Sequence, residues 1–545
     1  MTRSDPPSSF LANLLLVLGS LLFTGLMIVL LEGTLRLLDI GPPESSRLGF
    51  QQIELPVLEP AVRADGTEVW RTRDPRHPYQ SIPRATDPSQ LRVFTFGASA
   101  TAGLGFSPNV AFSRRLERML ARAHPQLTPE VVNLGIVGIS SGQVAQLVAD
   151  VCRTYAPDVL VVYSGNNEFL ELHAEKYAEA QATLTSRALD LLLGSRLYRV
   201  TRQALGRRPS DPSLADRELS RDDFELARDT LLREVEVTPE EIRGVIDRYE
   251  ENLDEIARTA AAEGIPLVLM TVGSNWRWLG REDLPADWID ELLGDAAPLD
   301  RARLERADRV LAQELDSSPP SRRHEWHFRR AVVAEGLGDF DAARANYRAA
   351  MNEDPHLRRA LDAMNERVAA VAARRGAILV DTVDRLARSA ERGIVGFDEY
   401  FDHVHFTPRG AERAAAALFD GLLEGGVLPT PGRFDPAAYL SERLAWLDDL
   451  DHDALDVTEW LGLGFESAQV ADRDLWKYDR MVAGLDAHAE IPADRLRALV
   501  YRGNAASFRR HGGTDAERDY REALELEDDP AIRRNLERLL ARGER

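Results

Sequence analysis

The sequence predicts an α/β protein built on a five-stranded parallel sheet flanked by helices, with helical insertions and a helical C-terminal region. From Leu91 onward, short apolar runs alternate with stretches of amphipathic helical pattern. The apolar runs are nearly continuous, as expected for strands whose two faces are both covered by helices. Two long helical tracts, residues 181–245 and 276–360, interrupt the alternation, and a third, residues 431–545, follows it.

The five strand candidates are short runs rich in apolar residues. In chain order they read RVFTF, VVNLG, DVLVVYS, PLVLMTV and AILVD. The segments between these runs are predicted to be helices. In one of them, apolar residues recur at three- and four-residue spacing, namely Ile246, Tyr249, Leu253, Ile256, Ala257 and Ala260. Ligands of such sheets bind beyond the carboxyl ends of the strands, so the residues directly after each run are the candidates for chemistry.

The N-terminal 40 residues predict a membrane anchor. The segment from Phe10 to Leu31 has 22 uncharged, mostly apolar residues, against about 20 needed to cross a bilayer as a helix. Neither an A-x-A-like cleavage site nor a cysteine for lipidation follows it, which favours a single-pass uncleaved anchor over a cleaved signal peptide. The flanking arginines do not decide its orientation. Residues 41–88 form a stalk or N-terminal extension with one hairpin at Asp65 and Gly66.

Composition excludes several classes of function. The 545 residues carry a net charge of −22, which disfavours nucleic-acid binding. Cys152 is the single cysteine, so an intrachain disulfide and a zinc site made of several thiolates are excluded. It lies in an apolar helical pattern and is expected to be a buried thiol. No motif in the sequence predicts a bound cofactor.

The second helical tract resembles a tetratricopeptide repeat near residues 324–357. Its packing positions would be Gly338, Phe340, Ala343, Tyr347, Ala350 and Pro355. A weaker match, out of register by a residue or two, places Ala516, Tyr520, Ala523 and Pro530 in the C-terminal tract. An isolated repeat cannot bury its own face, so these units are expected to pack on neighbouring helices or on a protein partner.

The turn after the first strand, GASATAG at residues 97–103, is the first chemical candidate. Its small residues allow a sharp turn that presents the Ser99 hydroxyl at the start of a helix, where backbone N–H groups can bind an oxyanion. The turn lacks the lysine and spacing of a phosphate-binding loop, and Thr101 rules out G-x-S-x-G. Read alone, Ser99 could equally be an ordinary N-cap serine.

Two further strand ends carry candidate oxyanion donors. Gly138 in NLGIVGISSG can offer a backbone N–H, and Asn167 in YSGNNEF can offer a side-chain amide. The alternatives are a plain turn glycine and an asparagine that closes its own loop.

The segment YFDHVHFTPRG follows the fifth strand and supplies an acid and a base. Asp402 and His405 are three residues apart, so in a helical turn the carboxylate would face the imidazole and orient it. Such a pair could activate Ser99 as a triad. Alternatively, Asp402 could cap a helix, and His405 could be a core histidine whose hydrogen bonds are all satisfied. His403 and His405 could also be two ligands of a metal site, but the sequence shows no second cluster of His or carboxylate residues to complete the ligand set.

The order Ser, Gly, Asn, Asp-x-x-His after successive strands resembles the SGNH (GDSL-type) hydrolase superfamily. The resemblance spans roughly residues 90–180, 245–275 and 360–425 and implies a flavodoxin-like domain over residues 89–430. It implies a Ser99 nucleophile, an oxyanion hole from the Ser99 N–H, Gly138 and Asn167, and a triad completed by Asp402 and His405. Two departures exist, because Ala98 stands where the family often has Asp and Glu168 where Asp is usual.

The resemblance implies a membrane-anchored serine esterase or lipase acting on an ester-containing small molecule, lipid or glycan, with its catalytic domain outside the cytoplasm. An acyltransferase with a glycan acceptor, or a silent scaffold that binds proteins through its helical repeats, remains an alternative. The locally basic segment 187–208 could lie on the membrane surface or cover the pocket. It could equally pack its leucines on the domain and expose its arginines.

Overall fold

A computed structural model describes most of the chain. The residues described are 8–37, 53, 55–62, 66–73, 80–104, 111–180, 195–204, 237–278, 284, 287–400, 402–448, 499, 513–526, 532–533, 536–537 and 539–540. They divide into two compact units. One contains residues 1–52 and 174–220, and the other contains residues 53–173 and 221–545.

The larger unit is built on the predicted parallel sheet. Its strands are β4 (Gln90–Gly97), β5 (Thr128–Gly135), β6 (Val159–Tyr163), β7 (Leu267–Met270) and β8 (Ile378–Val380). The spatial order is β5-β4-β6-β7-β8, and every neighbouring pair is parallel. Each strand coincides with one of the five predicted apolar runs, so the fold class is confirmed. The central strands are buried, with Phe94, Phe96 and Val161 at 0% exposure.

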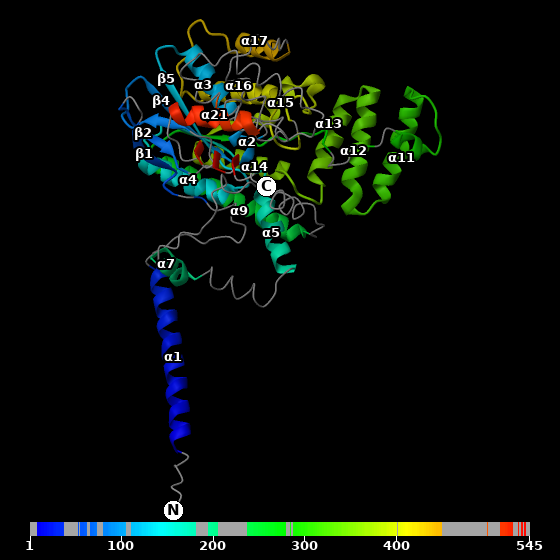
Figure 1. The fold of residues 1–545 in the computed structure, drawn as a ribbon. Coiled ribbons are helices and arrows are strands. Elements are labelled where there is room, and N and C mark those ends of the chain that lie inside the picture. The colour runs from blue at the N-terminus through cyan, green and yellow to red at the C-terminus, as the bar shows by residue number, and fades with distance from the viewer. Residues whose placement is uncertain are drawn as a thin grey trace, which may run out of the picture. The chain divides into compact units, whose positions relative to one another are not determined.

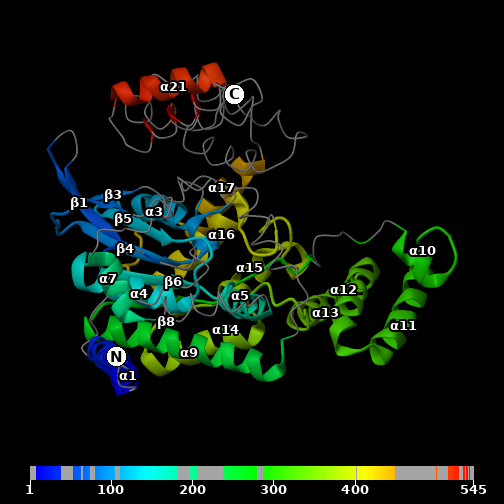
Figure 2. The same ribbon diagram turned by 60° about the horizontal axis from the view of Figure 1, so that its bottom comes forward.

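Helices cover both faces of this sheet (Figures 1 and 2). One face carries α4 (Ser141–Thr154), α9 (Pro239–Ala262) and α14 (Asp362–Arg375), and the other carries α3 (Phe112–Ala123) and α16 (Pro408–Glu424). All six apolar positions predicted for the helix that became α9 are buried.

The predicted end of the first helical insertion, near residue 245, falls inside α9. The helix begins at Pro239, where Thr238 accepts the Glu241 N–H and the Glu241 side chain returns to the Thr238 N–H. This reciprocal cap satisfies two backbone donors and starts the helix six residues before the predicted boundary.

Part of the predicted N-terminal extension is a small antiparallel sheet. Its strands are β1 (Leu58–Val62), β2 (Glu68–Thr72) and β3 (Ser81–Pro83), and the β1–β2 hairpin was predicted at Gly66, whose φ is 84°. The segment is fastened to the α/β core, because Val57 N donates to Asp150 Oδ2 at 2.9 Å and the Tyr155 hydroxyl donates to Leu58 O at 2.9 Å.

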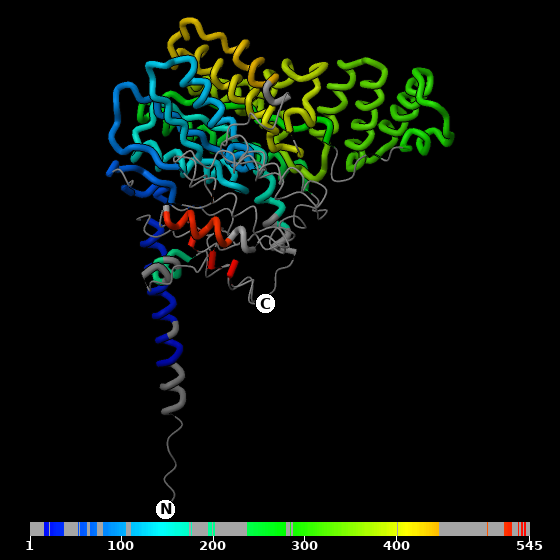
Figure 3. Tube along the Cα trace, turned by 45° about the horizontal axis from the view of Figure 1, so that its top comes forward, coloured from blue at the N-terminus to red at the C-terminus, as the bar shows by residue number. Residues whose placement is uncertain are grey.

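Four helices between β7 and β8 form a helical arm. They are α10 (Trp288–Leu293), α11 (Arg301–Ser317), α12 (Pro320–Leu337) and α13 (Phe340–Asn352). The last three stack side by side, in green at the right of Figures 1 and 3. Tyr347 is buried and packs edge-on against Phe328, with ring centroids 5.4 Å apart. The tetratricopeptide assignment of the α12–α13 pair stays a prediction.

The remaining elements of this unit are short or lie toward the C-terminus. They are α2 (Ser99–Ala102), α5 (Glu168–Ala180, which runs into the smaller unit), α15 (Thr382–Ser389), η3 (Glu391–Gly393), α17 (Pro436–Asp448) and α21 (Gly513–Leu526). In α21, Tyr520 and Ala523 are buried in a small apolar cluster, and the repeat assignment of this helix stays a prediction. Pro530 lies outside the described residues.

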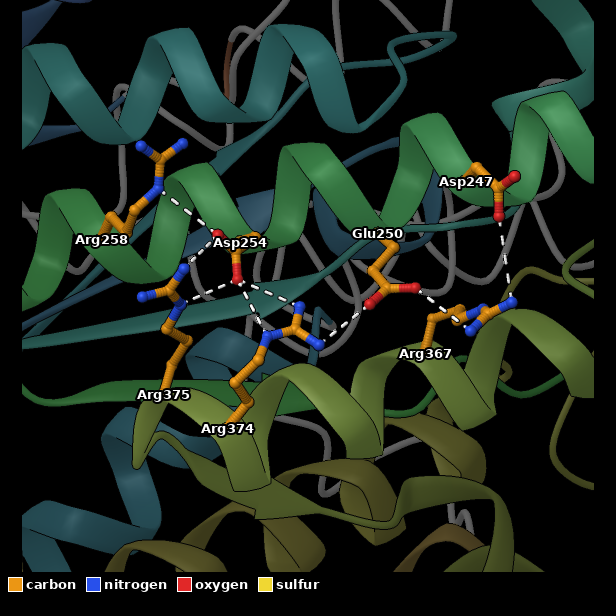
Figure 4. A network of polar contacts seen from close by, with 7 residues as sticks. All are labelled: Asp247, Glu250, Asp254, Arg258, Arg367, Arg374 and Arg375. Carbon is orange, nitrogen blue, oxygen red and sulfur yellow. Dashed lines mark hydrogen bonds and ion pairs between the residues drawn. The ribbon is translucent and has the colours of Figure 1, made fainter.

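A network of ion pairs joins α9 to α14 on the surface (Figure 4). The network joins three carboxylates of α9 to three arginines of α14. The carboxylates are those of Asp247, Glu250 and Asp254, and the arginines are Arg367, Arg374 and Arg375. Asp254 also pairs with Arg258 of its own helix. The pKa of Asp254 is lowered to about 2, first by the hydrogen bond from Arg375 and then by that from Arg374.

We expect Asp254→Asn to lower the stability of the protein by on the order of 1 kcal/mol at pH 6. The native pKa lies below the unfolded value near 3.9. The stabilisation is therefore present above about pH 4 and is lost as the pH falls through 2. Urea unfolding should give midpoints that differ at pH 6 and converge as the pH falls below about 2. Asp316→Asn on the exposed face of α11 is the control, and a difference independent of pH would contradict the assignment.

The smaller unit contains α1 (Ser8–Leu37) and α7 (Arg196–Ala204). Within residues Leu16–Leu37 of α1, an 18-residue window has a mean hydropathy of 2.1, and the helix has the length of a membrane span or a signal sequence. Glu32 of α1 caps α7, because its carboxylate accepts the N–H groups of Arg196 and Leu197 and the Ser195 hydroxyl. Of the basic segment 187–208, only residues 195–204 are described, and its role stays a prediction.

Candidate active site

Ser99 is the first residue of α2, directly beyond the carboxyl end of the interior strand β4. A side chain at Gly97 would overlap Tyr163 O and the Thr101 hydroxyl, so the turn needs glycine there. Thr101 Oγ1 donates to Tyr163 O at 3.0 Å, which ties the turn to β6. Because Ser99 starts the helix, its N–H has no acceptor within α2 and can bind an oxyanion.

A continuous hydrogen-bonded chain runs from Ser99 through His405 to Asp402. Ser99 Oγ lies 2.7 Å from His405 Nε2, and His405 Nδ1 lies 2.6 Å from Asp402 Oδ2. A carboxylate can only accept, so the imidazole proton resides on Nδ1 and Nε2 is left to accept the serine proton. Ser99 and His405 are only 8% and 9% exposed. The structure thus brings together three of the five predicted residues in the geometry of a triad.

The local geometry of Asp402 differs from the helical turn that its spacing suggested. Residues 402–405 are not helical, and Asp402 Oδ1 instead accepts the N–H groups of Val404 and His405, both at 2.8 Å. This turn leaves the second carboxylate oxygen aimed at the imidazole. Burial alone would raise the pKa of Asp402, but the charge and hydrogen bond of His405 outweigh it and hold the pKa well below its usual value.

Strand register places Gly138 and Asn167 on either side of Ser99. Gly97 at the end of β4 is aligned with Gly135 of β5 on one side and with Tyr163 of β6 on the other. The loops after these two neighbouring strands carry Gly138 and Asn167. Gly138 has a φ of 83°, in the left-handed region that favours glycine. Asn167 Nδ2 donates to Ile139 O at 3.0 Å, which joins the two loops and leaves its second amide hydrogen for a ligand.

Glu168 holds together the two loops that carry Gly138 and Asn167. The sequence shows only that Glu168 stands where the family usually has Asp, and it does not predict this role. Its carboxylate accepts the Ser141 N–H and the Ser141 hydroxyl, each at 2.8 Å. Asn252 Nδ2 donates to the same hydroxyl oxygen at 2.9 Å. Burial raises the pKa of Glu168 to about 7, against the opposing effect of these hydrogen bonds. Glu168 is therefore a positioning residue for the loops that carry Gly138 and Asn167.

We expect Glu168→Gln to lower kcat/KM for ester hydrolysis about tenfold at pH 8, because one charge-assisted hydrogen bond is lost. The ionised carboxylate accepts both bonds from Ser141, so activity should fall as the pH drops through about 7. The slope of log kcat/KM against pH around pH 7 should therefore be steeper in the wild type than in the variant. Glu240→Gln, on an exposed turn of α9, is the control, and an unchanged slope would contradict this role.

His403 and Cys152 take no direct part in the arrangement. The His403 ring stacks on Trp278 with centroids 4.9 Å apart, and burial lowers its pKa to about 4. Within the described part of the chain, no group of three or more His, Cys, Asp or Glu residues could hold a metal ion. Cys152 is buried, as predicted, and burial raises the pKa of its thiol to about 11.

A family model and several solved structures match this chain. A family model described as GDSL-like lipase/acylhydrolase matches residues 93–418. No curated protein matches the chain. Among solved structures, Axe2, an acetylxylan esterase from Geobacillus stearothermophilus, is 13% identical over 64% of this chain and 100% of its own, with a TM-score of 0.29. LAE5, an alpha/beta hydrolase from the metagenome of Lake Arreo in Spain, is 15% identical. The match covers 64% of this chain and 99% of LAE5, with a TM-score of 0.27. At such low similarity, the substrates of these proteins carry no argument about this chain.

Proposed function

The chain belongs to the GDSL-like lipase/acylhydrolase family, and we propose that it is a membrane-anchored serine esterase with a Ser99–His405–Asp402 triad. The observation that carries the proposal is the hydrogen-bonded chain across Ser99, His405 and Asp402, which joins residues 306 positions apart in the sequence. An N-cap serine or a core histidine would not need this geometry. The apolar stretch Leu16–Leu37 supports an anchor. That the catalytic unit lies outside the cytoplasm is part of the proposal.

The proposed reaction is a two-step acyl transfer to water. Ser99 Oγ attacks the ester carbonyl carbon while His405 Nε2 takes its proton, and Asp402 stabilises the resulting imidazolium. The carbonyl oxygen becomes an oxyanion that accepts hydrogen bonds from the N–H groups of Ser99 and Gly138 and from Asn167 Nδ2. The alcohol leaves with the proton from His405, and an acyl-Ser99 ester remains. Water, deprotonated by His405, then attacks this ester and releases the acid.

An active-site probe tests the proposal before any natural substrate is known. The purified protein should react with a fluorophosphonate, and peptide mass spectrometry should place the label on Ser99. It should also hydrolyse 4-nitrophenyl esters, with hydrolysis blocked by the label. Labelling at another serine, or full ester hydrolysis by labelled protein, would refute the assignment.

We expect Asn167→Ala to lower kcat by about 10²- to 10³-fold with a small change in KM. The amide contacts the oxygen only once negative charge develops on it, so its removal acts on the transition state. Steady-state kinetics on 4-nitrophenyl acetate measure the effect. Asn346→Ala on α13 is the control. A loss expressed mainly in KM would mean that Asn167 binds substrate and does not stabilise an oxyanion.

A further inference from the structure

The described residues within 396–407 form a catalytic loop that contains the acid and the base of the proposed triad. The loop is closed at its base, because Tyr400 and Phe406 form an isolated antiparallel bridge on either side of the acid and the base. One residue further out, the Thr407 N–H donates to Glu399 O at 2.9 Å. The two ends of the loop are therefore held side by side by backbone bonds.

Aromatic rings pack against the base of the catalytic loop. Phe406 is buried, and its ring stacks on that of Tyr400 with centroids 5.0 Å apart. It also contacts Tyr163 of β6 and Phe112 of α3, with centroid distances of 5.5 and 6.2 Å. The Tyr400 hydroxyl fills the space that a side chain at Gly273 would need. This packing buries the base of the loop, but apolar contacts have no preferred direction and do not fix where the loop lies along the sheet.

Glu399 supplies directional contacts between the catalytic loop and α16. Its side chain is 1% exposed, and Oε2 accepts the Gly396 N–H at 2.9 Å. Its other oxygen, Oε1, accepts a hydrogen bond from Nη1 of Arg413 on α16. The backbone of Glu399 also lies directly against the first turn of α16, because a side chain at Gly410 would overlap Glu399 O. One carboxylate thus joins the start of the loop to the helix that follows the loop.

A buried ion pair of this kind adds little net stability, because both charges lose their water and apolar side chains of similar volume can pack equally well. What apolar side chains cannot supply is direction, whereas charge-assisted hydrogen bonds fix the geometry of the groups that they join. The proposed proton transfer needs such precision, since Ser99 Oγ lies 2.7 Å from His405 Nε2. A displacement of about 1 Å in a catalytic group can slow a reaction about 10²-fold.

We propose that Glu399 is a positioning residue of the reaction, which ties the catalytic loop to α16 so that His405 Nε2 stays within reach of the Ser99 hydroxyl. The proposal rests on the esterase function proposed above. Glu399 acts through the loop that it holds, and the step that it supports is the transfer of the serine proton to His405. Its removal should therefore lower kcat and leave KM nearly unchanged.

Glu399→Gln tests this role in the full-length protein. The neutral amide cannot accept both hydrogen bonds with the strength of a carboxylate, so we expect kcat for 4-nitrophenyl acetate to fall by about 10- to 100-fold per folded molecule. The rate constant for fluorophosphonate labelling of Ser99 should fall by a similar factor, because labelling also requires a base to take the serine proton. Thermal unfolding followed by circular dichroism gives the folded fraction by which both rates are divided.

A double variant, Glu399→Leu with Arg413→Met, separates positioning from stability. It leaves no buried charge without its partner, so it should unfold near the wild-type temperature, yet it should lose as much kcat as the single variant. Glu412→Gln is the matched control, because Glu412 of α16 is also buried and pairs with Arg115 of α3 and Arg443 of α17. The control should lower the unfolding temperature and leave kcat per folded molecule unchanged.

Three results would overturn the positioning role. They are a kcat per folded molecule within about twofold of wild type in either Glu399 variant, a loss expressed mainly in KM, and an equal loss of kcat in Glu412→Gln. In each case, ester cleavage and Ser99 labelling by the wild type would leave the esterase function standing. A wild-type protein that neither cleaves esters nor is labelled at Ser99 would refute the function itself.

Discussion

Replacement of Ser99 by alanine is expected to lower kcat for ester hydrolysis by on the order of 10⁴- to 10⁶-fold. The variant keeps the turn at the end of β4, since that turn depends on Gly97 and on the Thr101–Tyr163 hydrogen bond and does not depend on the serine hydroxyl. It loses the hydroxyl that lies 2.7 Å from His405 Nε2 and is the proposed nucleophile. Substrate binding and the oxyanion donors remain, so KM should change little.

Steady-state hydrolysis of 4-nitrophenyl acetate, together with fluorophosphonate labelling, measures this effect. Ser164→Ala is the matched control, because Ser164 lies just beyond β6 and its buried hydroxyl has no hydrogen-bond partner among the described residues. The control should retain both activity and labelling. If Ser99→Ala kept more than a tenth of wild-type activity, Ser99 would not be the nucleophile.

Replacement of Asp402 by asparagine is expected to lower kcat by on the order of 10⁴-fold near pH 7. The asparagine carbonyl can still accept the N–H groups of Val404 and His405, so the turn should survive. Its amide would face His405 Nδ1 as a donor and would favour the tautomer with the proton on Nε2. That tautomer cannot accept the serine proton, and no carboxylate remains to stabilise the imidazolium.

Asp398→Asn serves as the control, because this exposed aspartate lies four residues upstream. Circular dichroism should show the same fold for both variants. Part of the lost activity should return at alkaline pH, where hydroxide can replace the histidine as a base. A loss smaller than tenfold at pH 7 would mean that the acid orients the imidazole without contributing its charge.

The strands and most of the candidate site could be predicted from local sequence. Buried parallel strands are nearly continuous apolar runs, so the segments around Phe94 and Val161 were recognisable without their neighbours. Ser99, Gly138, Asn167 and the Asp402–His405 pair each follow such a run, and the carboxyl ends of parallel strands lie on one edge of the sheet. The residue types at that edge, together with the family resemblance, were therefore the basis for predicting them as site residues.

Contacts between segments that are distant in the sequence could not be predicted from local sequence. The spacing of Asp402 and His405 suggested a helical turn, but hydrogen bonds from Val404 and His405 to the Asp402 carboxylate form a different turn with the same result. Glu168 looked like a simple replacement for Asp, and only its contacts with Ser141 show that its carboxylate links two loops. The capping box of Thr238 and Glu241 marks the start of α9, seven residues before the first of the periodic apolar positions at Ile246.

The sequence by itself determined the α/β class, the five apolar strands, the apolar N-terminal helix and the residue types needed for ester hydrolysis, because each depends on neighbours within one or two turns of chain. The tertiary structure alone decided the strand order β5-β4-β6-β7-β8, the approach of His405 to Ser99 and the pairing of Glu399 with Arg413. These depend on how crossover connections fold distant segments onto one edge of the sheet. Side-chain packing sets that arrangement, and no local periodicity encodes it.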